Sequence, residues 1–288
     1  MLSLLNPGIE AFLAVVRQGT VHGAAREIGL SQTGVTQRIR GLERGLGATL
    51  FERSRRGMRP TAEGEALVRW CQNVGELEGE LLSFARRGAE ANAVRVTVTG
   101  PSSLMRSRVI PQMGAAQGAF PGVTLRFLLD DTGGGLGHLK TGVAQLAVLG
   151  RDDVVNELDA KPLRPVRYRL VGPARWAGRE PAEFVASERI VDFDEADDAT
   201  FAFLRARGLL SGARRRRHLV NNPDALAELV AGGFGYSVLA DDFAAPWLED
   251  GRLVDLCPGM HLDQEISLAW YPRHEMSEYF RALVDSVR

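Results

Sequence analysis

The chain contains very little cysteine: Cys71 and Cys257 are the only two in 288 residues. Two thiols so far apart exclude a disulfide framework and a zinc site built on a CxxC pair. We interpret them as reduced structural thiols, with a redox sensor as the alternative. A catalytic Ser/His/Asp set, a metal-ligand cluster and a phosphate loop are also missing, and the glycines of "DTGGGLGHLKTG" do not follow a dinucleotide-binding order. We therefore expect no enzyme activity, no cofactor and no metal ion.

Long apolar runs are missing as well. No run approaches the roughly 20 residues that span a bilayer, and "MLSLLNPGIE" lacks the basic segment of a secretion signal. The sequence therefore predicts a cytoplasmic protein with no membrane partner. With 45% hydrophobic and 25% charged residues, its composition is that of a globular protein of two or three domains.

Lysine is almost absent, since Lys140 and Lys161 are the only two and the other basic residues are arginines and histidines. The formal net charge of −1 says little about partners, because an overall balance can hide a local excess. Such an excess lies between residues 31 and 60, where seven arginines face two glutamates. This clustering, rather than the preference for arginine, indicates a nucleic-acid partner.

Three helical patterns and one hairpin pattern fill residues 1–60. The first helix follows Asn6, a good N-cap, and ends at Gly19; a short second helix lies in "TVHGAAREIGL"; Ser31 caps the third. The packing face of the third helix is an apolar stripe at helical spacing, namely Val35, Ile39, Leu42 and Leu46. The alternation in "ATLFERSRRGMRPT" predicts a two-stranded hairpin. Together these elements predict an all-α winged helix-turn-helix domain.

The polar face of the third helix and the hairpin carry the candidate DNA-binding residues. In the major groove glutamine suits adenine, arginine suits guanine, and threonine reaches a phosphate or a thymine methyl group. Hairpin arginines suit salt-sensitive backbone contacts and the minor groove. The predicted set is Gln32, Thr33, Thr36, Gln37, Arg40, Arg53, Arg55, Arg56 and Arg59. Gly34 destabilises a helix by about 1 kcal/mol relative to alanine, which close helix packing or close approach to DNA would explain.

Residues 61–90 predict one long helix with apolar side chains three and four positions apart. Alone, this helix would leave its stripe in water, so we expect it to pair with its copy in a homodimer. The alternative is packing on its own chain. The stripe comprises Ala66, Leu67, Trp70, Val74, Leu77, Leu81 and Phe84.

Residues 91–288 alternate between strand and helix patterns, which predicts an α/β fold class with parallel sheets covered on both faces. The first strands are "VRVTVTG", "VTLRFLL" and "AQLAVLG", and a second set is "YRLVGP", "RIVDF", "RRHLVN" and "GYSVLA". The strand "QEISLAWYP" and the last helix are expected to return to the first set. We therefore expect two Rossmann-like lobes, 91–163 with 265–288 and 164–264, with a ligand cleft between them.

Polar residues at strand ends and helix starts are the candidates for ligand binding in this cleft. Serines at a helix start suit a ligand carboxylate, because the first N–H groups of a helix are free. Aspartates after strands can meet an ammonium or guanidinium group, and an asparagine before a helix can complete the pocket. The alternative for these positions is ordinary helix capping. The predicted set is Ser102, Ser103, Asp130, Asp131, Asp194 and Asn222.

Four consecutive arginines, Arg214 to Arg217, lie in "RARGLLSGARRRRHLV". We interpret the run as a charged edge strand that prevents unwanted pairing, or as an oligomer contact. A second nucleic-acid site is the alternative.

The run "FLAVVRQGTVHGAAREIGLSQTGVTQRIRGLERGLGATLFERSRRGMRPTAEG" resembles a LysR-type transcriptional regulator, and the resemblance extends over essentially the whole chain. It implies a winged helix on a dimerising linker helix, followed by an effector-binding domain like the type II periplasmic binding proteins. It also implies double-stranded DNA and a small-molecule effector as partners, a homodimer or homotetramer, and RNA polymerase as a further partner.

A narrower resemblance lies in the effector half. "RIVDFDEADDATFAFLRARGL", "TGVAQLAVLG" and the segment from "HLVNNPDALAELV" onward look like the ArgP/LysG branch, whose members sense lysine or arginine and activate a basic amino acid exporter. That branch often has Asn-Ala-Asp-Ser where this chain has "GPSS", residues 100–103. If the missing carboxylate holds a cationic ligand there, the ligand of this chain differs.

The preferred hypothesis is therefore a transcriptional activator gated by lysine or arginine in the cleft. Effector binding would favour one arrangement of the lobes and shift how the paired winged helices sit on DNA. The alternatives are a LysR-type regulator of another small metabolite and an architectural DNA-binding protein without a ligand.

Overall fold

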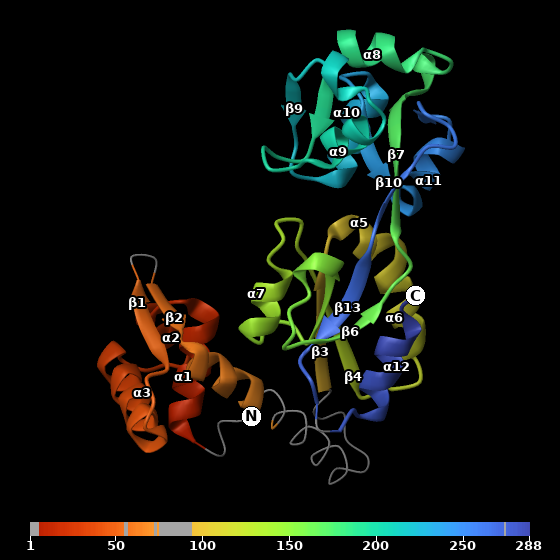
Figure 1. Ribbon diagram of the computed structural model, residues 1–288. Coiled ribbons are helices and arrows are strands. Elements are labelled where there is room, and N and C mark those ends of the chain that lie inside the picture. Colours follow the sequence, from red (N-terminus) through yellow and green to blue (C-terminus); the bar gives the residue numbers. More distant parts are fainter. Residues whose placement is uncertain (1–5, 55–56, 72–73, 75–93, 274) are drawn as a thin grey trace.

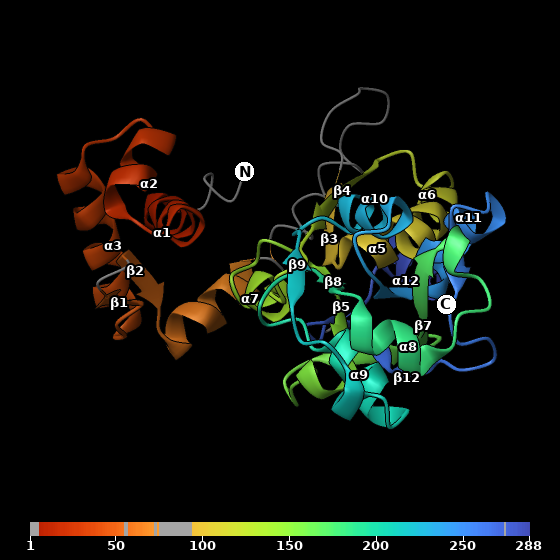
Figure 2. The ribbon, with the colours of Figure 1, turned by 90° about the horizontal axis from the view of Figure 1, so that it is seen from above.

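The computed structural model describes residues 6–54, 57–71, 74, 94–273 and 275–288 (Figure 1). Its first elements are α1 (Pro7–Gln18), α2 (Val21–Glu27), α3 (Gln32–Leu46), β1 (Phe51–Ser54) and β2 (Gly57–Pro60). These helices and the hairpin form the winged helix-turn-helix that the sequence predicts, and Figure 2 shows them as a unit of their own.

Side-chain caps start α1 and α3. Asn6 Oδ1 accepts a hydrogen bond from the Gly8 N–H (2.7 Å), and Ser31 Oγ accepts one from the Gly34 N–H (3.0 Å). α1 ends at Gly19, whose φ of 65° lies in the left-handed region. Each boundary is therefore set by residues that lie close to it in the sequence.

The core of this domain is built from one face of each helix. Phe12 and Val15 of α1, Ala24 of α2 and Val35 of α3 are fully buried. The Phe51 ring, from the hairpin, lies 5.1 Å from the Phe12 ring between centroids. Burial of a large apolar side chain contributes roughly 1.5–3 kcal/mol, so this small cluster holds the three helices and the hairpin together.

Two expectations for α3 are wrong. Leu46 is 52% exposed, because the helix continues one turn past Leu42, the last of its apolar side chains to reach the core. Close helix packing does not explain Gly34 either: a Cβ there would meet only Ser31 and Leu30 within 4 Å, the nearest atom being Ser31 Oγ at 3.3 Å. Close approach of Gly34 to DNA stays a prediction.

The chain continues from β2 into a helix over residues 62–71. Thr61 fixes its start, because its hydroxyl donates to the Thr49 carbonyl (2.7 Å) and accepts from the Gly64 N–H (3.0 Å). Gly64 is required here, since a Cβ would lie 2.3 Å from the Leu50 carbonyl oxygen. The helix is therefore anchored on the winged domain.

Only part of the predicted dimer stripe lies in the described residues. Trp70 is 49% exposed and Ala66 is exposed, whereas Val68 and Cys71 on the same helix are buried. Leu77, Leu81 and Phe84 lie outside the described residues, so pairing through the full stripe stays a prediction. The guanidinium carbon of Arg69 lies 5.0 Å from the Tyr271 ring centroid, so this helix also contacts the late part of the chain.

The first lobe surrounds a five-stranded sheet of order β4-β3-β5-β13-β6. Its strands are β3 (Val94–Gly100), β4 (Val123–Leu129), β5 (Leu146–Gly150), β6 (Asp159–Pro162) and β13 (Ile266–Trp270). Its helices are α5 (Ser102–Leu104), a π-helical turn (Met105–Val109), α6 (Ile110–Gln117), α7 (Gly135–Lys140) and α12 (Glu278–Ser286). The late strand β13 lies between β5 and β6, which confirms that the chain returns to the first sheet.

The second lobe contains β7 (Val166–Pro173) paired with three other strands, β10 (Ser237–Ala240), β11 (Leu253–Asp255) and β12 (Leu262–Gln264). A separate pair is β8 (Ile190–Asp192) with β9 (Arg217–Leu219). Its helices are α8 (Pro181–Ser187), α9 (Ala199–Ala206), α10 (Pro223–Gly232) and α11 (Asp241–Glu249). Short 3-10 turns lie at Arg151–Asp153, Ala174–Trp176 and Leu210–Gly212.

The prediction of parallel sheets is correct only in part. β3 pairs parallel with β4 and β5, and β8 with β9. However, β13 is antiparallel to both neighbours, and all three partners of β7 are antiparallel to it. The reason is topological: β7 carries the chain away from the first lobe, and β12 brings it back. The short strands β6, β11 and β12 and helix α8 were not predicted.

The two lobes are joined where β6 leads into β7 and where β12 leads into β13. These crossings are neighbours, because the Leu163 N–H donates to the Ile266 carbonyl (3.0 Å). Arg108 of the π-helical turn holds the first crossing: it donates to the carbonyls of Arg164 (2.7 Å) and Pro165 (3.2 Å) and pairs with Asp242 of α11. The junction is therefore tied from both lobes.

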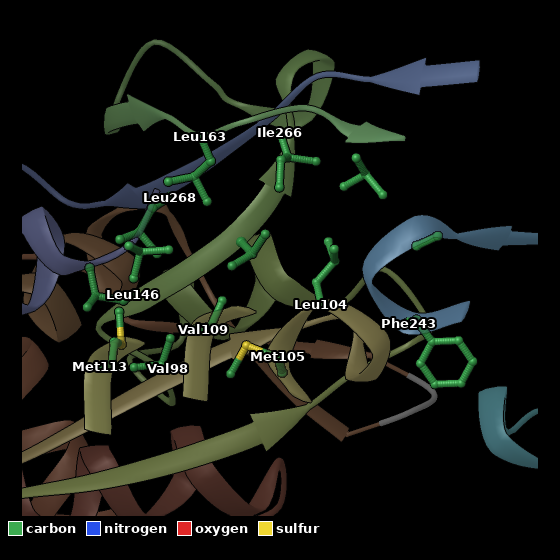
Figure 3. Close-up of a cluster of buried hydrophobic side chains, with 14 of the residues drawn as sticks. Val98, Leu104, Met105, Val109, Met113, Leu146, Leu163, Phe243, Ile266 and Leu268 are labelled. Atoms are coloured by element: carbon green, nitrogen blue, oxygen red, sulfur yellow. The ribbon is translucent and has the colours of Figure 1, made fainter. Parts of the chain in front are cut away.

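One apolar cluster continues across this junction. Figure 3 shows Leu104, Met105 and Val109 of the first lobe, with Ile266 of β13, and Phe243 of α11 at its far side. All of them are buried. This cluster also contributes Val148, Leu226 and Phe243 to the lining of the cleft described below.

Candidate functional site

The polar face of α3 is exposed, as a DNA-reading surface requires. Gln32, Thr33, Gln37 and Arg40 are exposed, and Thr36 is half-buried. The Thr36 hydroxyl donates to the Gln32 carbonyl (2.8 Å), so its proton is already used within the helix. The structure brings these five predicted residues together in the first nine residues of α3, and helix-turn-helix proteins place the N-terminal part of this helix against base edges.

Other arginines near α3 have structural partners. Arg38 pairs with Glu10 of α1 (3.1 Å), which ties the two helices together. Arg44 donates from Nε to the Arg40 carbonyl (3.3 Å), one turn earlier. The arginine cluster of residues 31–60 is thus divided between exposed arginines that are predicted to contact DNA and arginines whose contacts hold the helix in place.

The hairpin is fixed against the end of α1. The Met58 N–H donates to the Gly19 carbonyl (2.8 Å). Gly57 has a φ of 121°, and a Cβ on it would lie 2.4 Å from that same carbonyl oxygen, so only glycine fits. Arg59 pairs in register with Glu52 and is exposed. Of the other predicted wing residues, Arg53 lies in β1, and Arg55 and Arg56 lie outside the described residues.

A cavity of about 530 Å³ opens between the two lobes of the effector half. Four of the predicted effector residues line it: Ser103, Asp130, Asp131 and Asp194. Ser102 and Asn222 do not, although their neighbours Pro101 and Pro223 do. Sequence reasoning missed further polar residues of the lining, namely Thr132, Asp153, Tyr168, Asp197 and Gln264.

Asp131 caps the helix that precedes it in the chain. Its Oδ1 accepts from the Ser102 N–H (2.7 Å) and its Oδ2 accepts from the Ser102 hydroxyl (2.7 Å). The capping alternative for Asp131 is therefore correct in kind, but it names the wrong helix: α5 comes before Asp131, not after it. Ser102 is occupied by Asp131 rather than open to the cleft.

Asp130 is held in the turn after β4. Its Oδ1 accepts from the Thr132 N–H (2.8 Å) and hydroxyl (2.6 Å), and its Oδ2 lies 3.4 Å from His138 Nδ1. Burial raises the pKa of the Asp130 carboxyl, but the bonds from Thr132 and the charge of His138 outweigh it and leave the pKa below its ordinary value. Asp130 is thus a carboxylate at neutral pH.

Two more carboxylates of the cleft lie in the loop between β8 and α9. Asp194 Oδ1 accepts from the N–H groups of Ala196 (2.8 Å) and Asp197 (2.9 Å). Asp197 in turn accepts from Phe193 (3.1 Å) and Ala199 (3.0 Å). The loop is therefore built on its own carboxylates, which face the cleft from the second lobe.

Arg217 of β9 holds this loop from behind. It donates to the carbonyls of Asp194 (3.2 Å), Asp197 (3.1 Å) and Glu195 (2.9 Å), and to the Asp192 carboxylate (3.1 Å). The last of the four consecutive arginines is therefore a structural residue on a short edge strand. Arg214 likewise donates to a backbone carbonyl, that of Ser187 (2.9 Å).

Asp192, beneath the loop, is fully buried. Burial raises its pKa to about 6, and hydrogen bonds from Thr200 and Arg217 only partly oppose that rise. Asn222, at the start of α10, serves as an ordinary cap: its Oδ1 accepts from the Ala225 N–H (2.9 Å).

The lining of the cleft is acidic and apolar. It contains five aspartates, and among the described residues that line it there is no lysine, arginine or histidine. Apolar side chains lie between the carboxylates, from both lobes: Leu136, Val148, Phe193, Leu226 and Phe243. Such a pocket can bind a small organic cation with a hydrocarbon part.

Two of the missed residues had a usable signal. Asp153 follows β5, and parallel strands β3, β4 and β5 end at one edge of the sheet, where Asp130 and Asp131 also lie. Asp197 lies three residues after Asp194 in "DEADD". Tyr168 and Gln264 gave no signal, because the pairing of β7 with β12 joins residues nearly a hundred positions apart.

The described part of the chain contains neither a metal-binding cluster nor a membrane-spanning helix. No group of three or more histidines, cysteines, aspartates or glutamates there is arranged to hold a metal ion. None of the helices in these ranges has the length and apolar character to cross a bilayer.

Comparison with known families matches both halves of the chain. Residues 8–65 match the bacterial regulatory helix-turn-helix protein of the lysR family, and residues 89–288 match the LysR substrate binding domain. The regulator PtxR of Pseudomonas aeruginosa is 31% identical over 285 residues, covering 96% of this chain and 90% of that protein. The regulator ArgP of the same species is 27% identical over 296 residues, covering 96% and 92%.

Solved structures show the same fold. ArgP from Mycobacterium tuberculosis matches with a TM-score of 0.75 at 24% identity, over 98% of this chain and 95% of that one. Full-length LysG from Corynebacterium glutamicum, with bound effector Arg, matches with a TM-score of 0.71 at 22% identity, over 97% and 95%. With the domain matches, these comparisons confirm the resemblance drawn from the sequence: the chain belongs to the LysR family, as a ligand-responsive, DNA-binding transcriptional regulator and not an enzyme.

Proposed function

We propose that this regulator responds to a small organic cation of the basic amino acid type, meaning lysine, arginine or an amine derived from them, bound in the cleft between the lobes. The observation that carries the proposal is the lining: five carboxylates and, among its described residues, no basic side chain. Opposite charges in a partly desolvated cleft attract far more strongly than in water. An anionic ligand would meet only like charge there.

The size of the cleft supports the same class of ligand. About 530 Å³ lies within the range of pockets for small molecules. The apolar side chains between the carboxylates suit the methylene chain of such a cation. The Tyr168 hydroxyl donates to Gln264 (3.1 Å) at the junction of the lobes, where it adds a polar group that can orient the ligand.

A ligand in this position would act on the arrangement of the lobes. Two arginines of the π-helical turn already pair across the junction, Arg106 with Asp224 (2.5 Å) and Arg108 with Asp242. A cation bound between carboxylates of both lobes favours the arrangement that brings those carboxylates together. The coupling to DNA equals the difference in ligand affinity between the two arrangements.

The regulator in this proposal is a homodimer, or a tetramer formed by two such dimers, that binds double-stranded DNA through residues 1–60. The exposed Trp70 and Ala66 support pairing through the 61–90 segment, because a second copy would cover them. The α3 face and the wing arginines provide the DNA contacts. Residues 91–288 form the effector-binding domain, and the regulated gene encodes an exporter of the ligand, which rests on the resemblance to ArgP and LysG.

The test is thermal melting of the full-length chain against amino acids, amines and organic acids, followed by DNA footprinting with each compound that shifts the melting temperature. A ligand at 100 times its dissociation constant stabilises the folded state by about 2.7 kcal/mol. We expect basic compounds to stabilise the wild type and to change the footprint.

Asp194→Asn should weaken the stabilisation, since it removes one charge from the lining. Asp198→Asn is the matched control: Asp198 is exposed, pairs with Arg205 (3.4 Å) and does not line the cleft. Stabilisation by another class of metabolite would support a ligand-responsive regulator but contradict the proposal that its ligand is a cation. No response to any compound would favour an architectural DNA-binding protein.

A further inference from the structure

We infer that the cleft selects a cation without a carboxylate, an aliphatic diamine or guanidino-amine, over the corresponding amino acid. This inference rests on the proposed function, because it concerns the same cleft and narrows its ligand. Its basis is the charge of the lining: five carboxylates and, among its described residues, no basic side chain, with side-chain oxygens of the protein already bonded to the starts of three helices beside the cleft. Asp131 is the residue that sets the preference.

The first such position is the start of the helical segment that begins at Ser102. A helix start attracts an anion through its free N–H groups. Here the anion is Asp131, whose two carboxylate oxygens each accept a 2.7 Å bond from Ser102. Because Asp131 itself lines the cleft, a ligand carboxylate at Ser103 would lie beside a fixed negative charge.

At two other helix starts beside the cleft, one backbone N–H is bonded to a side-chain oxygen in the same way. α9 begins beside the cleft, where Asp197 accepts from the Ala199 N–H (3.0 Å). α10 begins at Pro223, which has no N–H, and Asn222 accepts from the Ala225 N–H (2.9 Å). At each of these three helix starts, a side-chain oxygen of the protein therefore already accepts a hydrogen bond from one of the first backbone N–H groups.

Basic side chains do not open another position for a carboxylate. The two that approach the acidic turns, His138 and Arg217, lie behind the lining: His138 is near Asp130 (3.4 Å), and Arg217 is bonded to the 192–197 loop. Neither contributes to the lining itself. The positive groups near the cleft are thus committed to the protein's own carboxylates.

The distribution of the carboxylates suits a ligand that is cationic at both ends. Asp130, Asp131 and Asp153 belong to the first lobe, and Asp194 and Asp197 to the second. The apolar side chains of the lining come from both lobes as well. A methylene chain with an ammonium or guanidinium group at each end matches this order of charge, hydrocarbon and charge, whereas an amino acid brings a carboxylate to one end.

Two matched pairs of compounds test the inference on the full-length chain by isothermal titration calorimetry in phosphate buffer. The pairs are lysine with 1,5-diaminopentane, and arginine with agmatine, and within each pair the compounds differ only by the carboxylate. We expect the decarboxylated compound to bind at least about tenfold more tightly, since like charges at a binding site cost affinity. Equal or tighter binding of the amino acid would overturn the inference and leave the proposed function intact.

Variants of Asp131 show whether this residue is the cause. Asp131→Asn keeps an acceptor oxygen for Ser102 and removes the charge, and Asp131→Ala frees the helix start. In both, the affinity ratio of amine to amino acid should fall several-fold, with Asp198→Asn unchanged as the control. If the alanine variant does not fold, the asparagine variant alone tests whether Asp131 causes the preference for the amine. A ratio equal to that of the wild type would overturn the role of Asp131, whereas no binding of any of the four compounds would contradict the proposed function itself.

Discussion

The DNA-facing surface and the ligand cleft hold their charges in opposite ways. On α3, Arg40 is exposed and has no acidic partner among the described residues, so its guanidinium group can adjust to a polyanion. In the cleft, Asp130, Asp194 and Asp197 are each bonded by backbone N–H groups of their own turns. The α3 surface is therefore adaptable, whereas the cleft is organised before its ligand arrives, and this preorganisation lowers the entropy lost when the ligand binds.

The largest expected effect comes from removing the reading surface of α3. Replacement of Gln32, Thr36 and Arg40 together by alanine should lower affinity for a specific site by roughly 1,000-fold, because each good base contact contributes about 1–3 kcal/mol. Binding to unrelated DNA should change much less, since the wing remains. The measurement is fluorescence anisotropy on a duplex that the wild type selects from random DNA, beside a scrambled duplex.

Arg205→Ala serves as the control for this variant, since Arg205 is an exposed residue of the second lobe with a surface partner. Intact specific affinity in the triple variant would show that α3 does not read bases. The exposed face of α3 would then not be the adaptable DNA-binding surface, and only the description of the cleft would stand.

The next effect concerns the arginine that organises the cleft. Arg217→Ala should lower the free energy of unfolding by about 3 kcal/mol, because buried Asp192 loses its cation and three loop carbonyls lose their donor. Arg217→Lys should restore little of the lost free energy of unfolding, because an ammonium group cannot reproduce the planar fork of guanidinium donors. Urea unfolding measures both, with Arg205→Ala expected within about 0.5 kcal/mol of the wild type. A similarly small effect of Arg217→Ala would contradict this role.

A smaller, pH-dependent effect follows from Asp192. Burial raises its folded-state pKa to about 6, above the ordinary value near 4, so the folded chain holds this proton more tightly than the unfolded chain. Its contribution to stability is therefore present in full below about pH 4 and is lost as pH rises through 6. Asp192→Asn lacks this dependence.

The free energy of unfolding of the Asp192→Asn variant, relative to wild type, should accordingly rise by about 2 kcal/mol between pH 4 and pH 7. Urea titrations at each pH measure the difference. A difference that stays flat over this range would mean that Asp192 is ionised throughout, and that Arg217 compensates its burial in full.

The sequence was most informative where structure depends on near neighbours. The caps at Asn6 and Ser31, the stop at Gly19 and the bounds of β4 are as predicted. Each depends on residues a few positions away. Leu46 was misplaced because helical periodicity gives the direction of a side chain but not how far the core beneath it extends.

The cleft was harder to predict, because distant segments build it. Its aspartates were partly found as residues that follow strands, but the partner of Asp131 is 29 positions earlier, and Arg217 reaches back to Asp192 across 25 positions. The periodicity of apolar residues along the sequence does not predict contacts between residues so far apart. The antiparallel partners of β7 were missed for the same reason, since the direction of a strand depends on where the chain enters the lobe.

The hydrogen bond between Leu163 and Ile266 has a further consequence for how the effector domain is constructed. The chain enters and leaves the second lobe at adjacent points, so that lobe is an insertion into a complete five-stranded unit. A short loop joining these two residues would close the first lobe at little entropic cost, because the ends already meet. The second lobe, which carries Asp194 and Asp197, could therefore be replaced by the corresponding lobe of a relative. Such an exchange would leave every strand of the first sheet intact.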